Sequence, residues 1–212
     1  MLDKLFAQIA KPVPTGAVEY LIVGLGNPGA KYAGTRHNVG FEAIDALAAK
    51  AGVKIDRIKF QSVCADAMVG GKRVLLMKPS TFMNLSGQAV CEAMRFYKIP
   101  IEHVVVICDD VTQPVGRLRI RKSGSDGGHN GLKNIIYLSG SNNFPRVRIG
   151  VGQKPHPDYD LADWVLGKFS QQDAKTLLEL FKVIEPICQS IVNKNTDKAM
   201  NDYNNYGAQP NV

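Results

Sequence analysis

The stretch L-I-V-G-L-G-N-P-G-A-K-Y-A-G-T-R-H-N-V-G-F, Leu21 to Phe41, decides the fold. It opens with an apolar run of strand length, turns around Pro28, and ends where apolar residues begin to recur at helical spacing. The loop in between carries an Asn, a Tyr, an Arg and a His. In α/β proteins the loops that follow the carboxyl ends of strands carry the chemistry, so we expect this loop to be functional.

The rest of the chain continues the alternation of strands and helices. Apolar runs predict strands over 18–25, 60–69, 73–78, 103–108, 116–122 and 146–151, with a hairpin turning at Gly70-Gly71. Helical spacing predicts helices over 38–51, 84–97, 130–138 and 171–193. Hairpin and helical crossovers together indicate an α/β fold: a single domain with a twisted mixed β-sheet covered by helices. The pattern leaves the strand order open.

Three segments are expected along the chain: an N-terminal leader and linker over 1–17, the α/β domain over 18–200, and a flexible tail over 201–212 that is rich in Asn, Gly and Pro. The amphipathic start is too short for a secretory signal, and no apolar run approaches the roughly 18 residues of a membrane span. The 4 cysteines are scattered without a C-x-x-C pair. This favours reduced thiols in a cytoplasmic protein over a zinc site or a disulfide framework.

The net charge of +7 is the one compositional hint about a partner. Polyanions such as RNA attract basic proteins through counterion release, although many basic proteins bind no nucleic acid. The positive charges gather in two stretches: Arg117 to Lys122 is dense in Arg, and Arg146 alternates with Arg148. Both are predicted strands, so each would carry its arginines on one face.

Gly24 to Gly29 satisfies the G-x-G-x-x-G pattern of dinucleotide-binding folds. In that fold the helix opens at the glycines, so that its first amides receive the pyrophosphate. Here Pro28 removes one amide, and residues 31–37 intervene before any helical pattern. A nucleotide-binding oxidoreductase is therefore a weak alternative.

His37 directly precedes Asn38, the expected N-cap of a helix. The positive end of the helix dipole favours neutral imidazole, the form that a general base needs, although an exposed loop histidine is the simpler explanation. Asp109, at the end of the predicted 103–108 strand, would share a sheet edge with His37 if the two strands run parallel. Asp110 is a rival carboxylate. No nucleophile motif is present, which favours direct activation of water. His103, His129 and His156 are expected to have structural roles.

Asn27, Asn84 and Asn130 place three primary amides on loops that lead from strands into helices. Amides both donate and accept hydrogen bonds, which suits a peptide backbone, an ester carbonyl or ribose hydroxyls. Helix capping would equally explain Asn84 and Asn130, each at an expected N-cap.

Five segments in series resemble the bacterial-type peptidyl-tRNA hydrolases, over roughly Tyr20 to Gly167: G-L-G-N-P-G…T-R-H-N-V-G, K-P-S-T-F-M-N-L-S-G, D-D…P-V-G-R-L-R-I-R, G-G-H-N-G-L-K and R-V-R-I-G-V-G. The resemblance implies an enzyme that cleaves the ester between a peptide and the 3′ end of tRNA. It implies that His37 is the catalytic base and Asp109 its orienting acid. By the same resemblance, the substrate and tRNA contacts would come from Asn27, Tyr32, Met83, Asn84, Asn130, Arg121 and Arg148.

The resemblance implies no metal, no cofactor and no obligate protein partner: a cytoplasmic monomer that meets peptidyl-tRNA at its acceptor end and CCA terminus. Family members often carry an acid where Thr112 stands, which bears on the detail of that loop. A non-catalytic RNA-binding relative is the alternative, and the presence of His37, Asp109 and the three Asn residues argues against it.

Overall fold

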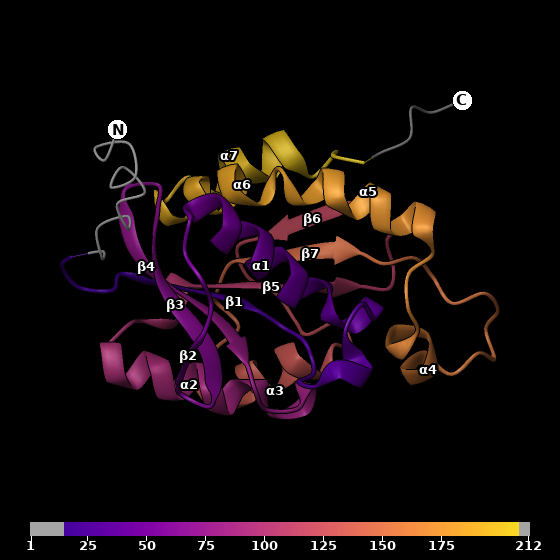
Figure 1. Cartoon of the computed structure of the whole chain (residues 1–212), viewed down its shortest axis with the longest axis horizontal. Helices are drawn as coiled ribbons and strands as arrows, with labels where there is room; N and C mark the ends of the chain where they lie inside the picture. Colours follow the sequence, from indigo (N-terminus) through magenta and orange to yellow (C-terminus); the bar gives the residue numbers. More distant parts are fainter. Residues whose placement is uncertain (1–14, 208–212) are drawn as a thin grey trace, which may run out of the picture.

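In the computed structural model, which describes residues 15–207, one sheet runs through the whole fold (Figure 1). Its spatial order is β2-β3-β4-β1-β5-β7-β6. The strands are β1 Tyr20–Gly24, β2 Arg57–Lys59, β3 Ser62–Val69, β4 Lys72–Pro79, β5 Val104–Asp110, β6 Leu118–Arg121 and β7 Arg146–Gly150. The four central strands, β4, β1, β5 and β7, are parallel. On one side β3 pairs antiparallel with β4 in a hairpin, and on the other side β6 pairs antiparallel with β7, with α3 between them in sequence. The prediction of a mixed sheet is confirmed.

Helices cover both faces of the sheet, as Figure 1 shows. They are α1 Val39–Ala51, α2 Ser86–Tyr97, α3 Asn130–Ser139, α4 Leu161–Leu166, α5 Gln171–Phe181, α6 Ile184–Val192 and α7 Thr196–Tyr203. Helices α1, α5, α6 and α7 pack on one face, and α2 and α3 on the other. None of the described helices is long and apolar enough to cross a membrane.

The central strand β1 is buried on both sides, because its side chains alternate between two cores. Tyr20 and Ile22 pack with α1 and α6, whereas Leu21 and Val23 pack with α2 and α3. The continuous apolar run that predicted this strand is typical of such a position.

Two glycines bring the start of α1 against the ends of the central strands. A Cβ on Gly24 would overlap the Gly40 carbonyl, and a Cβ on Gly40 would lie 2.5 Å from the Ile107 carbonyl oxygen. The helix therefore approaches β1 and β5 more closely than any larger residue would allow. This approach carries the 3₁₀ turn Arg36–Asn38, directly before α1, to the carboxyl end of β5.

The predicted helix over 171–193 is wrong in one respect: it is two helices, α5 and α6, with a break at Lys182 and Val183. Pro186 explains the break, because proline lacks an N–H and its ring would collide with the carbonyl of Lys182 one turn earlier. Two short helices, α4 and α7, and the edge strand β2 were not predicted.

The predicted leader lies outside the described residues except for 15–17. Of the predicted tail, residues 201–207 are described, and they pack against the fold. The Ile120 N–H donates to Asn204 Oδ1 at 2.6 Å, and Tyr203 and Tyr206 are partly buried against the core. The tail segment thus closes the outer edge of β6, which would otherwise expose unpaired backbone groups.

Candidate active site

A cavity of about 570 Å³ opens at the carboxyl ends of β1, β5 and β7. The parallel order brings together loops that are far apart in sequence. The lining residues are Asn27, Tyr32, His37, Phe82, Met83, Asn84, Asp109, Val111, Gly127, Gly128, His129, Asn130, Arg148, Leu161, Ala162, Val165 and Leu166. Every residue predicted for the site lines this cavity except Arg121.

His37 and Asp109 form the ionisable pair at its centre. The His37 ring Nδ1 lies 2.8 Å from Asp109 Oδ1, with the imidazole 13% exposed and the carboxylate 3% exposed. Strands β1 and β5 pair in parallel, so the loop after β1 and the end of β5 share one edge of the sheet. Because Asp109 is an acceptor here, the His37 proton is on Nδ1 and the Nε2 lone pair is left for a ligand.

A second histidine, His129, bonds the same carboxylate oxygen, with Nε2 at 2.9 Å from Asp109 Oδ1. Its other nitrogen, Nδ1, accepts from the N–H groups of Gly131 and Leu132 and so caps α3. A ring that accepts at Nδ1 and donates at Nε2 is the neutral tautomer. His129 was expected to have a structural role and no carboxylate partner. Its capping of α3 fits the structural role, but the bond to Asp109 shows that the second part of the expectation was wrong.

Asp109 is ionised in this setting. Burial alone would raise its pKa. The charge that the His129 or His37 ring carries when protonated, and the hydrogen bonds that both rings donate, act against burial, and the net pKa lies well below the ordinary value. A permanent carboxylate is what stabilises an imidazolium as it forms on His37.

Asp110 points elsewhere. Its Oδ1 accepts from the backbone N–H and the hydroxyl of Thr112, and its Oδ2 lies 3.1 Å from Arg148 Nε and 3.5 Å from Arg119 Nη1. Asp110 is fully buried and is not among the cavity-lining residues. Thr112, at the position where the resemblance suggested an acid, therefore serves to hold Asp110.

Asn27 is held by its surroundings. Its Oδ1 accepts from the Met83 N–H at 2.8 Å, and its backbone exchanges two hydrogen bonds with the Asn38 side chain. These bonds leave the Nδ2 group of Asn27 for the cavity. Asn38 was predicted to cap α1, but its amide ties down the Asn27 loop and makes no capping bond.

Asn84 and Asn130 are not helix caps. Asn84 lies within the 3₁₀ turn Met83–Leu85, and α2 begins after Leu85. Asn130 is the first residue of α3, whose cap is the side chain of His129. Both are exposed, and neither side chain has a hydrogen bond to another described residue. Capping therefore does not account for either amide.

The other walls are mostly apolar. The rings of Tyr32 and Phe82 meet edge to face with centroids 6.4 Å apart, and Met83 is buried between the Asn27 loop and α3. Helix α4 supplies the facing wall, which the sequence pattern missed. Its six residues are too few for helical periodicity to register.

The arginines of β6 and β7 share the sheet face that bears α3, because their neighbours Leu118, Ile120, Val147 and Ile149 all enter the opposite core. Their environments differ. Arg148 lines the cavity. Arg121 is exposed at the last residue of β6, opposite Arg146 at the start of β7. Arg146 is 1% exposed and donates to carbonyls of Gly124, Ser125, Asn142 and Phe144, so it holds the loop before α3.

His37, Asp109 and His129 also have the composition of a metal site, since one ligand atom from each lies within 4.8 Å of the others. These same three atoms, however, make the two hydrogen bonds described above. A metal there would have to replace both bonds. The donor set is therefore better explained as a hydrogen-bonded cluster.

The model of the family described as "Peptidyl-tRNA hydrolase" matches residues 21–211. The peptidyl-tRNA hydrolase of Clostridium tetani is 48% identical over 90% of this chain and 100% of its own length, and that of Caldanaerobacter subterraneus is 50% identical over 87% and 99%. The crystal structure of the Acinetobacter baumannii peptidyl-tRNA hydrolase superposes with a TM-score of 0.83 at 34% identity, covering 91% of this chain and 98% of that one.

Proposed function

The chain belongs to the peptidyl-tRNA hydrolase family, and on that premise we propose that His37 is its general base and Asp109 the acid that orients it. The enzyme hydrolyses the ester that joins a peptide to the 3′ end of tRNA. One observation carries the assignment of roles: the 2.8 Å bond from His37 Nδ1 to Asp109 Oδ1 leaves Nε2 free at the wall of the cavity.

The first step is proton removal from water. His37 Nε2 takes a proton, and the water oxygen attacks the ester carbonyl carbon. The imidazolium that forms is stabilised by the Asp109 carboxylate, which stays ionised. Among residues 15–207 no Ser or Cys lines the cavity, so the proposed reaction is a direct attack by water without an acyl-enzyme.

The second step breaks the ester. As the tetrahedral intermediate collapses, the ribose oxygen of the tRNA leaves and takes the proton back from His37. The products are a peptide carboxylate and a tRNA with a free 3′-terminal hydroxyl. Negative charge on the former carbonyl oxygen needs a donor, and the exposed Asn84 amide on the cavity wall is suited to that role.

His129 has a positioning role. It shares Asp109 Oδ1 with His37 and is itself fixed by the first amides of α3. The His129 Nε2–H donates to the Asp109 carboxylate and so restricts the rotation of that carboxylate. Asn130 follows directly in sequence, so the same helix start aims an amide into the cavity and orients the acid.

Hydrolysis of N-acetyl-aminoacyl-tRNA, with and without a chelator, tests the proposal. Release of N-acetyl-amino acid at the same rate in both samples supports water activation by His37. If release stops with chelator and returns with added metal, His37, Asp109 and His129 bind a metal, and their assignment as a hydrogen-bonded cluster is wrong. Binding of the substrate without release would identify a non-catalytic RNA-binding relative.

The three amides are expected to separate by stability and activity. Asn84→Ala and Asn130→Ala should leave the melting temperature unchanged, because neither side chain bonds the fold. Asn27→Ala should cost about 1–3 kcal/mol of stability, because the buried Met83 N–H loses its acceptor. Asn84→Ala should lower kcat, and Asn130→Ala should mainly raise KM. Thermal melts and steady-state kinetics on the same samples measure both.

Asn134→Ala is the matched control. Its Oδ1 accepts from the Gly87 N–H at 2.8 Å, but it does not line the cavity. We expect lower stability with unchanged kinetics at a temperature where the variant is folded. Normal activity of Asn84→Ala would show that the Asn84 amide does not stabilise the oxyanion.

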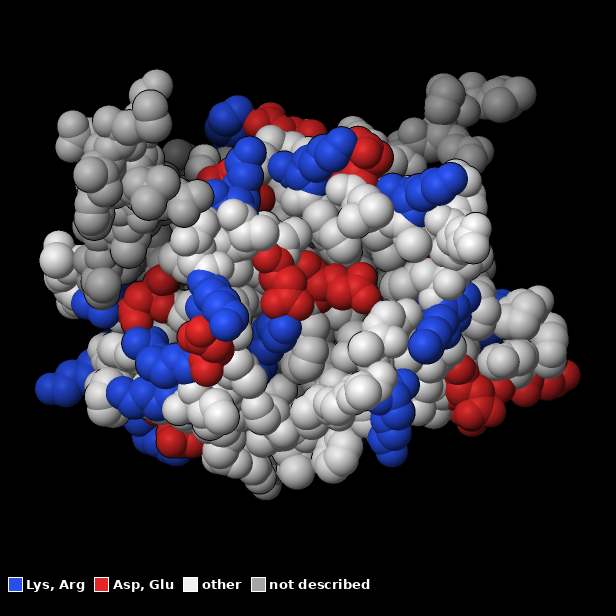
Figure 2. Space-filling view, viewed as in Figure 1, with Lys and Arg blue, Asp and Glu red and all other residues white. Residues whose placement is uncertain are grey.

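We also propose that Arg148 and Arg121 contact tRNA phosphates, Arg148 at the cavity beside the acceptor end and Arg121 farther along the same sheet face. The face shown in Figure 2 is not the expected tRNA-binding surface, because acidic side chains lie among its basic ones. Guanidinium groups suit phosphate because their planar fork can donate two parallel bonds.

Arg148→Ala and Arg121→Ala should each raise KM and flatten the log-log salt dependence of binding by close to one unit, with kcat nearly unchanged. Arg148→Ala should also lower stability, because the buried Asp110 loses its nearest cation. Within the described part of the chain, the Arg121 side chain bonds only the neighbouring Ile120 carbonyl, so its variant should fold normally. Binding titrations at several salt concentrations decide the matter, and an unchanged slope in both variants would place the tRNA footprint elsewhere.

A monomeric cytoplasmic enzyme is the simplest setting for this site. The cysteines, all buried and unpaired, fit a reducing compartment.

A further inference from the structure

Helix α4, which forms one wall of the cavity, has little stability of its own, because it has only six residues. Leu161, Ala162, Val165 and Leu166 line the cavity, and Leu161 remains 45% exposed. The position of this apolar wall must therefore depend on contacts with the rest of the fold.

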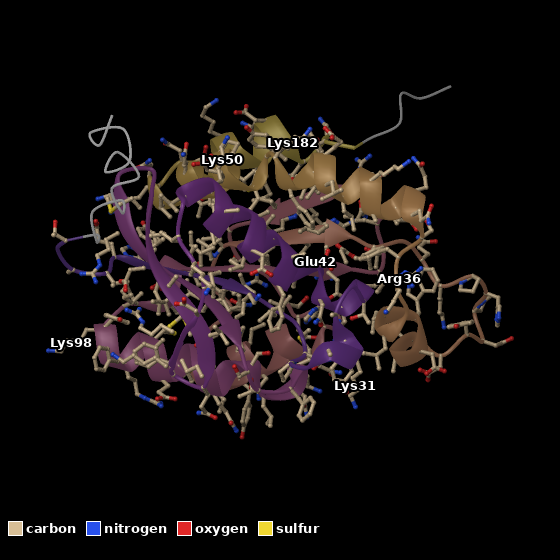
Figure 3. The ribbon with its side chains drawn as sticks, in the orientation of Figure 1. Lys31, Arg36, Glu42, Lys50, Lys98 and Lys182 are labelled. Atoms are coloured by element: carbon tan, nitrogen blue, oxygen red, sulfur yellow. The ribbon has the colours of Figure 1, made fainter. Side chains whose placement is uncertain are left out.

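Arg36, the residue before His37, makes the main side-chain contact to α4 from the catalytic loop. Its guanidinium carbon lies 3.7 Å from the centroid of the Trp164 ring and 5.5 Å from that of Phe169. The Arg36 N–H also donates to the Gly167 carbonyl at 3.0 Å, and Thr35 bridges to Lys168. Figure 3 marks Arg36 beside α4.

The face of the Trp164 ring is the main contact of the Arg36 guanidinium group. Its Nε is buried and has no hydrogen-bond partner within residues 15–207, and Nη1 reaches the Trp164 carbonyl only at 3.4 Å. Burial lowers the pKa of the guanidinium, and Asp173 and Tyr159 offset this only in part. A planar cation in this position is held by the aromatic face beneath it.

Trp164 is anchored on its other sides as well. Its Nε1 donates to the Gly152 carbonyl at 2.9 Å, and Tyr159 meets its ring edge to face. The indole thus lies between the catalytic loop and the segment that follows β7. Losing the Arg36 guanidinium would remove the main side-chain contact between α4 and the loop that carries His37. The backbone bond to Gly167 and the contacts behind the indole ring would stay in place.

We propose that Arg36 and Trp164 form a positioning pair that holds α4 beside His37, so that its apolar wall receives the side chain of the amino acid esterified to tRNA. The inference rests on the proposed function. The wall offers Leu161, Val165 and Leu166 but no cation, which suits an apolar side chain and not a phosphate. Neither residue touches the reacting atoms.

A double-mutant cycle tests the pair. Arg36→Lys keeps the charge but loses the planar stack, and Trp164→Leu removes the ring. Each should raise KM for N-acetyl-leucyl-tRNA by about 3-fold to 30-fold with little change in kcat, and the double variant should be no worse than either single one. For N-acetyl-glycyl-tRNA, which has no side chain for the wall, the rise should stay below about 2-fold.

Trp164→Phe keeps a ring for Arg36 and should restore a near wild-type KM. Arg95→Lys makes the same chemical change at an exposed position on α2 and serves as the control. Effects that multiply in the double variant, or that are equal for the leucyl and glycyl substrates, would overturn the proposal.

A fluorescence measurement keeps this test separate from catalysis. Trp164 is the only tryptophan in the chain, so its emission reports on α4 directly. In Arg36→Lys the emission should shift to the red and be quenched more readily by acrylamide, whereas Arg95→Lys should match the wild type. Unchanged quenching in Arg36→Lys would overturn the positioning pair. Failure of the wild type to hydrolyse either substrate would overturn the proposed function instead.

Discussion

Replacing His37 with alanine is expected to lower kcat by roughly 10²–10⁴-fold and to leave the affinity for tRNA nearly unchanged. The proposed base acts only on the water proton, and the arginines proposed to bind phosphate, Arg148 and Arg121, are other residues. Its ring bonds Asp109 at 2.8 Å and makes no bond that the fold needs. Single-turnover cleavage of N-acetyl-aminoacyl-tRNA, with binding measured on an uncleavable amide analogue, separates the two quantities.

His103→Ala is a control at the opposite end of the sheet. The His103 ring stacks on Tyr20 with centroids 4.3 Å apart and bonds the Glu19 carbonyl. We expect lost stability with normal turnover in the folded protein. If His37→Ala hydrolysed substrate at the wild-type rate, the mechanism would be wrong.

Asp109→Asn has the second large expected effect, a loss of about 10²–10⁴-fold in kcat. The amide removes the negative charge that stabilises the His37 imidazolium. It also introduces an N–H₂ group where two imidazoles now donate to one oxygen, so the ring tautomers can invert. Cleavage under single-turnover conditions measures the loss.

Asp110→Asn is its matched control, because the two acids are adjacent and both buried. We expect about 1–3 kcal/mol of lost stability, since Arg148 and Arg119 lose their counter-charge, and little change in kcat. The reverse outcome, a large loss of turnover in Asp110→Asn and a small one in Asp109→Asn, would exchange the two roles.

The sheet and the central pair follow from patterns within the sequence. The apolar runs that became β1 and β5 are continuous because both strands are covered on two faces. Parallel pairing of these strands places their following loops at one edge, which is why a loop histidine and a strand-end acid were expected to meet.

The errors have local causes. Asn84 and Asn130 were expected at N-caps, but a 3₁₀ turn precedes α2 and a histidine caps α3, and neither preference is visible in residue type alone. His129 was set aside because its link to Asp109 is made in space by the turn before α3. A Gly-Gly-His sequence directly before the helix was the available signal, since a His at a cap can turn its other nitrogen outward.

The basic strands show a further limit of sequence periodicity. Alternation placed Arg146 and Arg148 on one face, but it does not reveal which arginine is covered. Arg146 is buried among four carbonyl groups, whereas Arg148 reaches the cavity. That difference depends on the loop before α3, which folds over one end of β7. Only the three-dimensional packing distinguishes a structural arginine from one available to a ligand.

The double variant His37→Ala/Asp109→Asn tests the central claim most directly, by single-turnover cleavage beside both single variants. If Asp109 acts through His37, removing the carboxylate should cost nothing further once the imidazole is gone, so the double variant should cleave as slowly as His37→Ala. If the two losses multiply, the residues work independently, and the account of Asp109 as the orienting partner of a histidine base is contradicted.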